Sequence, residues 1–107
     1  MGFKPPRKVQ QEARKALDVR REKPPSQRGM TKTGIARARD LSNARPVSKR
    51  TLERMLSFFS RHEVDKKGKT WSKRGKGWQG WFGWGGDAGR SWARKLLKRE
   101  RSKSRNG

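Results

Sequence analysis

The stretch GKGWQGWFGWGGDAGRSWARKLLKRE, residues 75–100, holds four of the five tryptophans of the chain and sets them among glycines. Lysines and arginines follow at its end. Large rings beside flexible glycines have three explanations: a hydrophobic core built from rings, a platform on which bases stack, or wedges for a membrane surface. The choice depends on how much other apolar material the chain offers.

The rest of the chain is poor in apolar residues. It has 107 residues, enough for one small domain, with 31 Lys and Arg against 9 Asp and Glu and a formal net charge of +22. Leu, Ile, Val and Phe make up less than a fifth of it, a fraction typical of disordered chains. Each buried tryptophan removes roughly 150–250 Å² from water, so rings make a thin core possible. We therefore expect Trp81, Trp84 and Trp92 in the core.

Apolar residues three and four positions apart predict helices over residues 7–23, 31–44 and 48–64. Thr31 or Thr33 is the expected cap of the second helix, and Ser48 caps the third. The third helix is the clearest of them because its apolar stripe is the longest. That stripe consists of Leu52, Met55, Leu56 and Phe59.

The tryptophan-rich stretch itself predicts a turn between two further helical segments. Gly85-Gly86 is the expected turn, and Asp87 is the expected N-cap of a last helix. That helix would bury one line of side chains, and Ala93 and Leu97 would flank this line. The line consists of Ala88, Trp92 and Leu96.

No run alternates apolar and polar residues, so we predict an all-α fold: a small domain of three to four helices with a Trp-rich core. Residues 1–6 are expected to be a flexible arm and residues 7–93 the helical domain. Residues 94–107 are expected to be the end of the last helix and a basic tail. The termini are therefore predicted to be basic and partly disordered.

The charge predicts a polyanionic partner, and nucleic acid is the commonest one. Lysines and arginines gather on the polar face of the first helix, before the tryptophan block and in the C-terminal tail. The predicted nucleic-acid-binding residues are Arg7, Lys8, Arg14, Lys15, Arg20, Arg21, Lys73, Arg74, Arg94, Lys95, Lys98, Arg99, Arg101, Lys103 and Arg105. If about six of them contact phosphates, the logarithm of the binding constant should fall with that of salt with a slope near −5. Nothing in the pattern offers base-edge recognition, so largely sequence-independent binding is expected.

Two tryptophans are candidates for base stacking. Trp71 and Trp78 lie in sequence rich in Lys, Arg and Gly, where a ring is expected to stay exposed. A membrane wedge is disfavoured, because the apolar stripes are short and interrupted by glycine.

A catalytic or metal site is not expected. The chain has one histidine, His62, and no cysteine, so zinc sites built from His and Cys are not supported. Asp40, Glu63, Asp65 and Asp87 would have to gather to bind Mg²⁺ as a nuclease does. Each has a simpler local explanation: Asp40 and Glu63 pair with arginines, Asp65 ends a helix and Asp87 caps one. We predict no enzyme and no cofactor.

Three blocks in this order resemble a module of unassigned function in proteins of tailed bacteriophages, including phages of marine cyanobacteria. They are ARARDLSN (36–43), SKRTLERMLSFFSRHEVDKKG (48–68) and WFGWGGDAGRSWA (81–93). The chain departs from the module at GKTWSKRGKGWQG (68–80), which is richer in Lys and Gly. The resemblance implies a phage origin and a helical module, and it implies no reaction.

These observations predict a small basic phage protein that binds nucleic acid, DNA first and RNA second, through phosphates. A virion or host-directed interaction protein that docks its basic surface on an acidic protein is the alternative, and a metal-dependent nuclease is the weaker one. No secretory signal is recognisable in MGFKPPRKVQ (1–10), and no stretch suits a membrane span. The expected location is the host cytoplasm or the virion interior.

Overall fold

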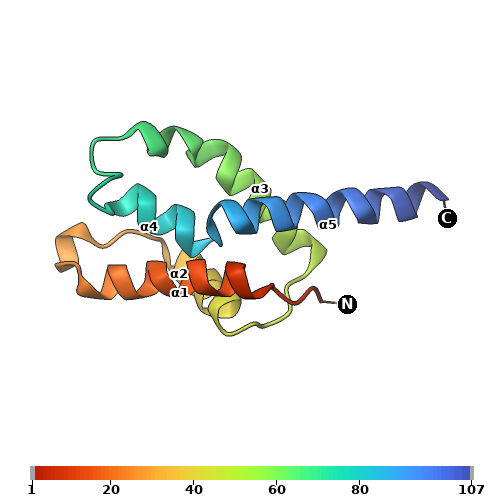
Figure 1. Ribbon diagram of the computed structural model, residues 1–107, viewed down its shortest axis with the longest axis horizontal. Helices are drawn as coiled ribbons and strands as arrows, with labels where there is room; N and C mark the ends of the chain where they lie inside the picture. Colours follow the sequence, from red (N-terminus) through yellow and green to blue (C-terminus); the bar gives the residue numbers. More distant parts are fainter. Residues whose placement is uncertain (1, 107) are drawn as a thin grey trace.

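The helices in the computed structural model follow the spacing of apolar residues in the sequence (Figure 1). The structure describes residues 2–106, and side chains as far as Ser102. The α-helices are α1 (Arg7–Glu22), α2 (Lys32–Ser42), α3 (Lys49–His62), α4 (Lys76–Gly83) and α5 (Gly86–Asn106), with 3₁₀ turns η1 (Pro25–Gln27) and η2 (Glu63–Lys67). Residues 2–106 form no strand, only an isolated bridge between Phe3 and Val47. The predicted all-α fold is confirmed.

Local signals explain where the first three helices begin and end. The hydroxyl of Thr31 accepts a hydrogen bond from the backbone N–H of Gly34 over 3.1 Å and caps α2. The hydroxyl of Ser48 accepts one from Thr51 over 3.2 Å and caps α3. These bonds satisfy N–H groups that a helix start leaves without a partner, and both caps were predicted. α1 ends just before Pro24, as expected from the loss of a backbone donor at proline.

The turn from α4 to α5 requires glycine. Gly85 and Gly86 have φ angles of +107° and +66°, a region that side chains rarely enter. A Cβ atom at Gly85 would lie 3.0 Å from the Cγ1 of Val9, so the turn also packs tightly against α1. The turn therefore fixes where α5 leaves the body.

The core is built around rings, as predicted. Trp81 is fully buried and meets Phe59 edge to face, with ring centroids 4.8 Å apart. Trp84 is buried as well, while Trp92 is half-buried against the same core. The aliphatic side chains and the methionine of this core come from α1, α2, α3 and α5 and from the segment before α3. They are Val9, Leu41, Val47, Leu52, Met55 and Leu97.

The helices form two packed groups. α1 lies mainly against α2 and α4, and α3 lies mainly against α5. Figure 1 shows that the second half of α5 extends past the other helices, which makes the molecule elongated, 50 × 27 × 21 Å. This projection is the main geometric feature that the helix spacing alone did not reveal.

The prediction of a flexible arm at residues 1–6 is wrong for the part from Phe3 to Pro6. The backbone N–H of Phe3 donates to the Val47 carbonyl over 2.8 Å, and the Val47 N–H donates back over 2.9 Å. Pro5 is fully buried. Met1 lies outside the described residues. The segment is held because its apolar side chains cover the linker between α2 and α3.

Three expectations for α5 need correction. Asp87 lies in the first turn of the helix instead of capping it, because Gly86 already begins the helix. The buried line is Ala93 and Leu97, while the expected line through Ala88, Trp92 and Leu96 is only half-buried. The helical backbone also continues past Leu97 to Asn106, since Lys, Arg and Glu favour helix without apolar contacts.

Candidate nucleic-acid interface

The outer part of α5 carries exposed cations along a helix that projects from the body (Figure 1). Five exposed cations lie between residues 94 and 101: Arg94, Lys95, Lys98, Arg99 and Arg101. At 3.6 residues per turn, Arg94, Lys95, Lys98 and Arg99 lie on the sides of the helix away from Ala93 and Leu97, while Arg101 lies one turn beyond Leu97 on the same side. Glu100 is the single acidic residue between 94 and 102. We call these five residues the α5 cations.

The α5 cations are not paired with carboxylates, although Glu100 lies among them. In the part of the chain whose side chains the structure describes, none of them takes part in an ion pair. Lys103 and Arg105, also predicted to bind, lie outside the residues whose side chains are described. The α5 cations are therefore free to meet an external anion.

A second basic cluster lies at the opposite end of the long axis, where the end of α1 meets the segment leading into α4 (Figure 1). The ammonium group of Lys23 donates to the Lys73 carbonyl over 2.8 Å. The Arg74 guanidinium and the Lys15 ammonium lie 5.0 and 5.7 Å from the ring centroid of Trp78. We call Lys15, Lys23, Lys73 and Arg74 the α1/α4 cluster. Three of its four members were predicted, and Lys23 was missed.

The other predicted cations of α1 mainly hold the fold. The guanidinium of Arg14 donates to the Ser42 carbonyl over 3.0 Å, and that of Arg20 donates to the Gly29 carbonyl over 2.8 Å. Lys8 pairs with Glu12 and Arg21 with Asp18, at 3.0 and 3.8 Å. Arg7 is exposed at the start of the helix.

Most of these cations stay exposed on the polar face of α1, although the helix itself packs into the body. The helix is clamped between α2 and α4, with its apolar side fully used. Its buried residues are Val9, Ala13, Ala16 and Val19. The fifteen predicted residues thus do not form one face.

Trp78 is not an exposed stacking platform. It is 7% exposed and packs on Ala16 and Val19. Phe82 lies 4.6 Å away between ring centroids, and Lys15 and Arg74 also lie over the ring. The prediction failed because local Lys and Gly content does not report that α1 lies alongside. Trp71 is half-buried, 6.2 Å from Trp81, and its proposed stacking role stays a prediction.

The carboxylates are engaged separately. Asp40 pairs with Arg37 and Arg45 at 3.4 and 3.6 Å, and Glu63 pairs with Arg90 at 3.5 Å, as the sequence led us to expect. Within residues 2–102, no three of the His, Asp and Glu side chains come together as ligands for a metal ion.

The other two candidate metal ligands, Asp65 and Asp87, are also bonded to side chains nearby. Asp65 accepts a hydrogen bond from the Nδ1–H of His62 over 3.1 Å. Asp87 accepts hydrogen bonds from the Trp81 indole and from Lys66, over 3.1 and 2.9 Å. Asp87 thus fastens the buried ring of Trp81 to the start of α5, a role that no local pattern predicts.

Comparison with known proteins adds no relative: no family model, curated protein sequence or solved structure matches this chain. In the described part of the chain, no helix combines the length and apolarity that crossing a membrane requires.

Proposed function

We propose that this is a small basic phage protein that binds nucleic acid, DNA first and RNA second, largely through phosphates. The observation that carries the proposal is α5, which exposes the α5 cations and whose projecting second half carries Lys98, Arg99 and Arg101 beyond the body; among the residues whose side chains are described, none of the five forms an ion pair. Such cations gain most from an anion that releases bound counterions, as nucleic acid does.

The shape of α5 also supports a nucleic-acid partner. An α-helix with its side chains is about 10–12 Å wide, close to the roughly 12 Å width of the major groove of DNA. A helix that projects from its domain reaches a groove or a phosphate row without a clash from the remaining helices. Because Lys and Arg dominate it, phosphate contacts should outweigh base-edge contacts.

The phage assignment rests on the three sequence blocks between residues 36 and 93. On this proposal the protein acts in the host cytoplasm or in the virion interior, where packaged DNA supplies the polyanion. An acidic virion or host protein is the competing partner, since the same cations would meet carboxylates. Binding of the chain to purified nucleic acid, with no other protein present, distinguishes these two partners.

The test is binding of the purified chain to short duplex DNA, single-stranded DNA and structured RNA across a salt series from about 50 to 200 mM. Arg94→Gln/Lys98→Gln/Arg101→Gln removes three α5 cations. Lys32→Gln/Arg39→Gln/Lys49→Gln removes three exposed cations from the body and keeps the same net charge. The first variant should flatten the salt slope by roughly one per charge removed, and the second should change it much less.

Two results would contradict the proposal. Equal losses in the two variants would mean that net charge alone, not α5, attracts the nucleic acid. Weak binding of all three nucleic acids at physiological salt would reject nucleic acid as the partner and direct the search to an acidic protein.

A further inference from the structure

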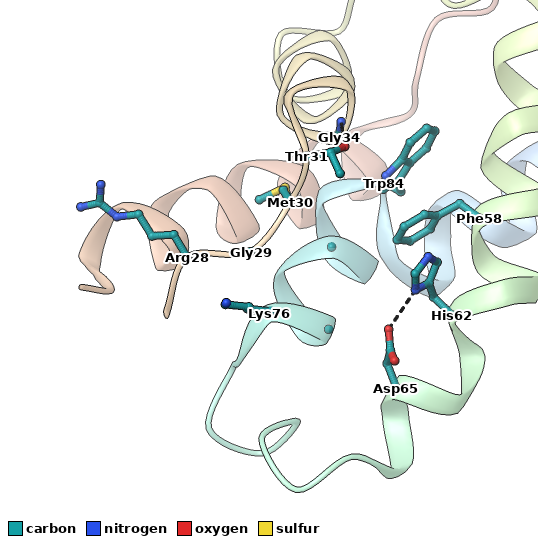
Figure 2. Close-up of a pocket in the computed structure, with 12 residues that line it drawn as sticks. Arg28, Gly29, Met30, Thr31, Gly34, Phe58, His62, Asp65, Lys76 and Trp84 are labelled. Carbon is teal, nitrogen blue, oxygen red and sulfur yellow. Dashed lines mark hydrogen bonds and ion pairs between the residues drawn. The ribbon is translucent and has the colours of Figure 1, made fainter. Parts of the chain in front are cut away.

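Three aromatic side chains form a row along one wall of a groove, separate from the α5 cations (Figure 2). The rings of Trp84 and Phe58 have centroids 5.0 Å apart and planes 16° apart. The rings of Phe58 and His62 follow at 4.4 Å and 27°. The row therefore has nearly parallel planes, the arrangement in which a further flat ring stacks favourably.

The row is closed at one end and open at the other. At the Trp84 end, the Arg37 guanidinium lies 5.9 Å from the ring centroid, and Trp84 is itself buried. At the other end the side chain of His62 is 44% exposed. Both faces of Phe58 are already taken by its two neighbours. The outer face of His62 is thus the place where the row accepts another ring.

The surroundings of His62 suit an unpaired base. Asp65 holds Nδ1 of the imidazole over 3.1 Å, which fixes the ring and leaves Nε2 available (Figure 2). Two residues further on, Val64 is 69% exposed, the one large hydrophobic side chain so exposed among the described residues. The fixed ring offers a flat surface on which a base stacks.

Charge differs between the two sides of the row. On one side lies the groove of about 540 Å³ shown in Figure 2, which is lined by one carboxylate, that of Asp65, and by two cations, Arg28 and Lys76. On the other side a groove of about 460 Å³ is lined by Arg54 and Arg61. These two arginines are seven residues apart on α3, on the same face of the helix. The second side has two arginines and no carboxylate among its lining residues, so it attracts a phosphate more directly than the first, where Asp65 opposes the two cations.

Two side-chain hydroxyl groups lie in the same groove as the arginines. Thr33 and Ser57 line the same groove as Arg54 and Arg61, and both residues are exposed. Arginine binds phosphate with two parallel hydrogen bonds, and hydroxyls add single ones. This groove therefore has the groups that a sugar–phosphate backbone needs.

We propose that the row Trp84–Phe58–His62 is a binding site for one unpaired nucleotide of a single-stranded nucleic acid. The base stacks on the open face of His62, and its phosphates lie on Arg54 and Arg61. The inference rests on the proposed nucleic-acid function and adds to it a substrate class, because a base inside a duplex is not free to stack on a protein ring.

The experiment uses His62 as its own reporter, since it is the only histidine of the chain. Its imidazole proton signals are followed by NMR while the full-length protein is titrated with a single-stranded oligothymidylate, a duplex of equal length or inorganic phosphate. The signals should shift to saturation with the single strand. They should move little with the duplex, which engages only phosphate contacts, or with phosphate alone.

Affinities of variants separate stacking from a structural role. His62→Ala should weaken single-strand binding about tenfold, the loss of one stacked base, and leave duplex binding unchanged. His62→Phe keeps a flat ring without the bond to Asp65 and should retain most of the single-strand affinity. Arg99→Gln, on α5, should weaken the single strand and the duplex alike.

The outcomes separate this inference from the proposed function. If the single strand and the duplex both bind and neither moves the His62 signals, nucleic-acid binding stands and the base site is rejected. A shift of equal size with inorganic phosphate would also reject it, because an anion then explains the change. If neither the single strand nor the duplex binds, both proposals fail together.

Discussion

The carboxylate of Asp87 accepts a hydrogen bond from the indole N–H of Trp81 over 3.1 Å, although Asp87 itself is exposed. Trp81 is fully buried and belongs to the core, so its N–H has to find a partner within the protein. This bond joins the largest ring of the core to the first turn of α5. The position of the projecting helix is thus coupled to the packing of the ring.

Asp87→Ala should lower the free energy of unfolding by about 1–3 kcal/mol, because a buried indole N–H loses its acceptor. Asp87→Asn keeps a carbonyl oxygen and should cost less. Urea unfolding followed by circular dichroism measures both. Lys66→Gln is the comparison: it removes the salt bridge to Asp87, whose side chain is largely exposed, and the ammonium group 4.3 Å from the Trp81 ring centroid, but it leaves the indole N–H bonded, so it should cost less than Asp87→Ala. A larger loss for Lys66→Gln than for Asp87→Ala would reject this assignment.

Gln79→Leu should be among the more damaging substitutions of a polar residue. The Gln79 side chain is fully buried and accepts a hydrogen bond from Gly29 N–H over 2.7 Å. It also donates to the carbonyls of Gln27 and Arg74 over 3.1 and 3.0 Å. Leucine has a similar volume but leaves these groups unpaired, so we expect a loss of roughly 2–4 kcal/mol in the free energy of unfolding.

The matched control for Gln79 is Gln11→Leu on the exposed side of α1, which should stay within about 0.5 kcal/mol of the wild type. Comparable urea midpoints for the two variants would mean that the bonds of Gln79 contribute little.

Glycine substitutions should have opposite effects at two positions. Gly85→Ala places a side chain at φ +107° and 3.0 Å from Val9, and should lower stability by about 1–3 kcal/mol. Ala44 already has a φ of +58°, so Ala44→Gly relieves strain and should leave stability equal or up to about 1 kcal/mol higher. Thermal melting of both variants tests the pair. A loss of stability in Ala44→Gly would show that this residue is not strained.

Trp78→Ala should unfold much of the protein at room temperature. Removing a buried tryptophan typically costs about 3–5 kcal/mol, a large share of the stability of a small domain. Trp71→Ala, at a half-buried ring, should cost less. The check combines urea unfolding with binding to single-stranded DNA. Full stability of Trp78→Ala with reduced binding would restore the stacking function that burial contradicts.

The helices could be predicted because their signals are local. Thr31 and Ser48 cap their helices within three residues, and the stripe of Leu52, Met55 and Phe59 has a spacing that any buried helix requires. The same locality explains the failures. Phe3 is paired with Val47, far along the chain, and no short pattern contains both.

The candidate sites divide in the same way. The α5 cations follow from composition, since a run of lysine and arginine beyond the last apolar residue stays exposed. Arg20 was predicted to bind an anion, yet its guanidinium donates a hydrogen bond to the Gly29 carbonyl. This contact exists because the loop between α1 and α2 runs back alongside α1. Phe58 and His62 are four residues apart on one helix, a local hint of stacking. Trp84 joins them only through the tertiary fold.

The elongation of the molecule bears on how the chain tolerates its own charge. From Leu97 to Asn106, the backbone of α5 extends about 13 Å, at a rise of 1.5 Å per residue. At physiological ionic strength the Debye length is about 8 Å, so the tip of the helix barely senses the cations of the body. The α1/α4 cluster lies at the far end of a 50 Å axis. The net charge of +22 is thereby spread along an elongated molecule. Its electrostatic self-energy is lower than that of a sphere with the same volume and charge.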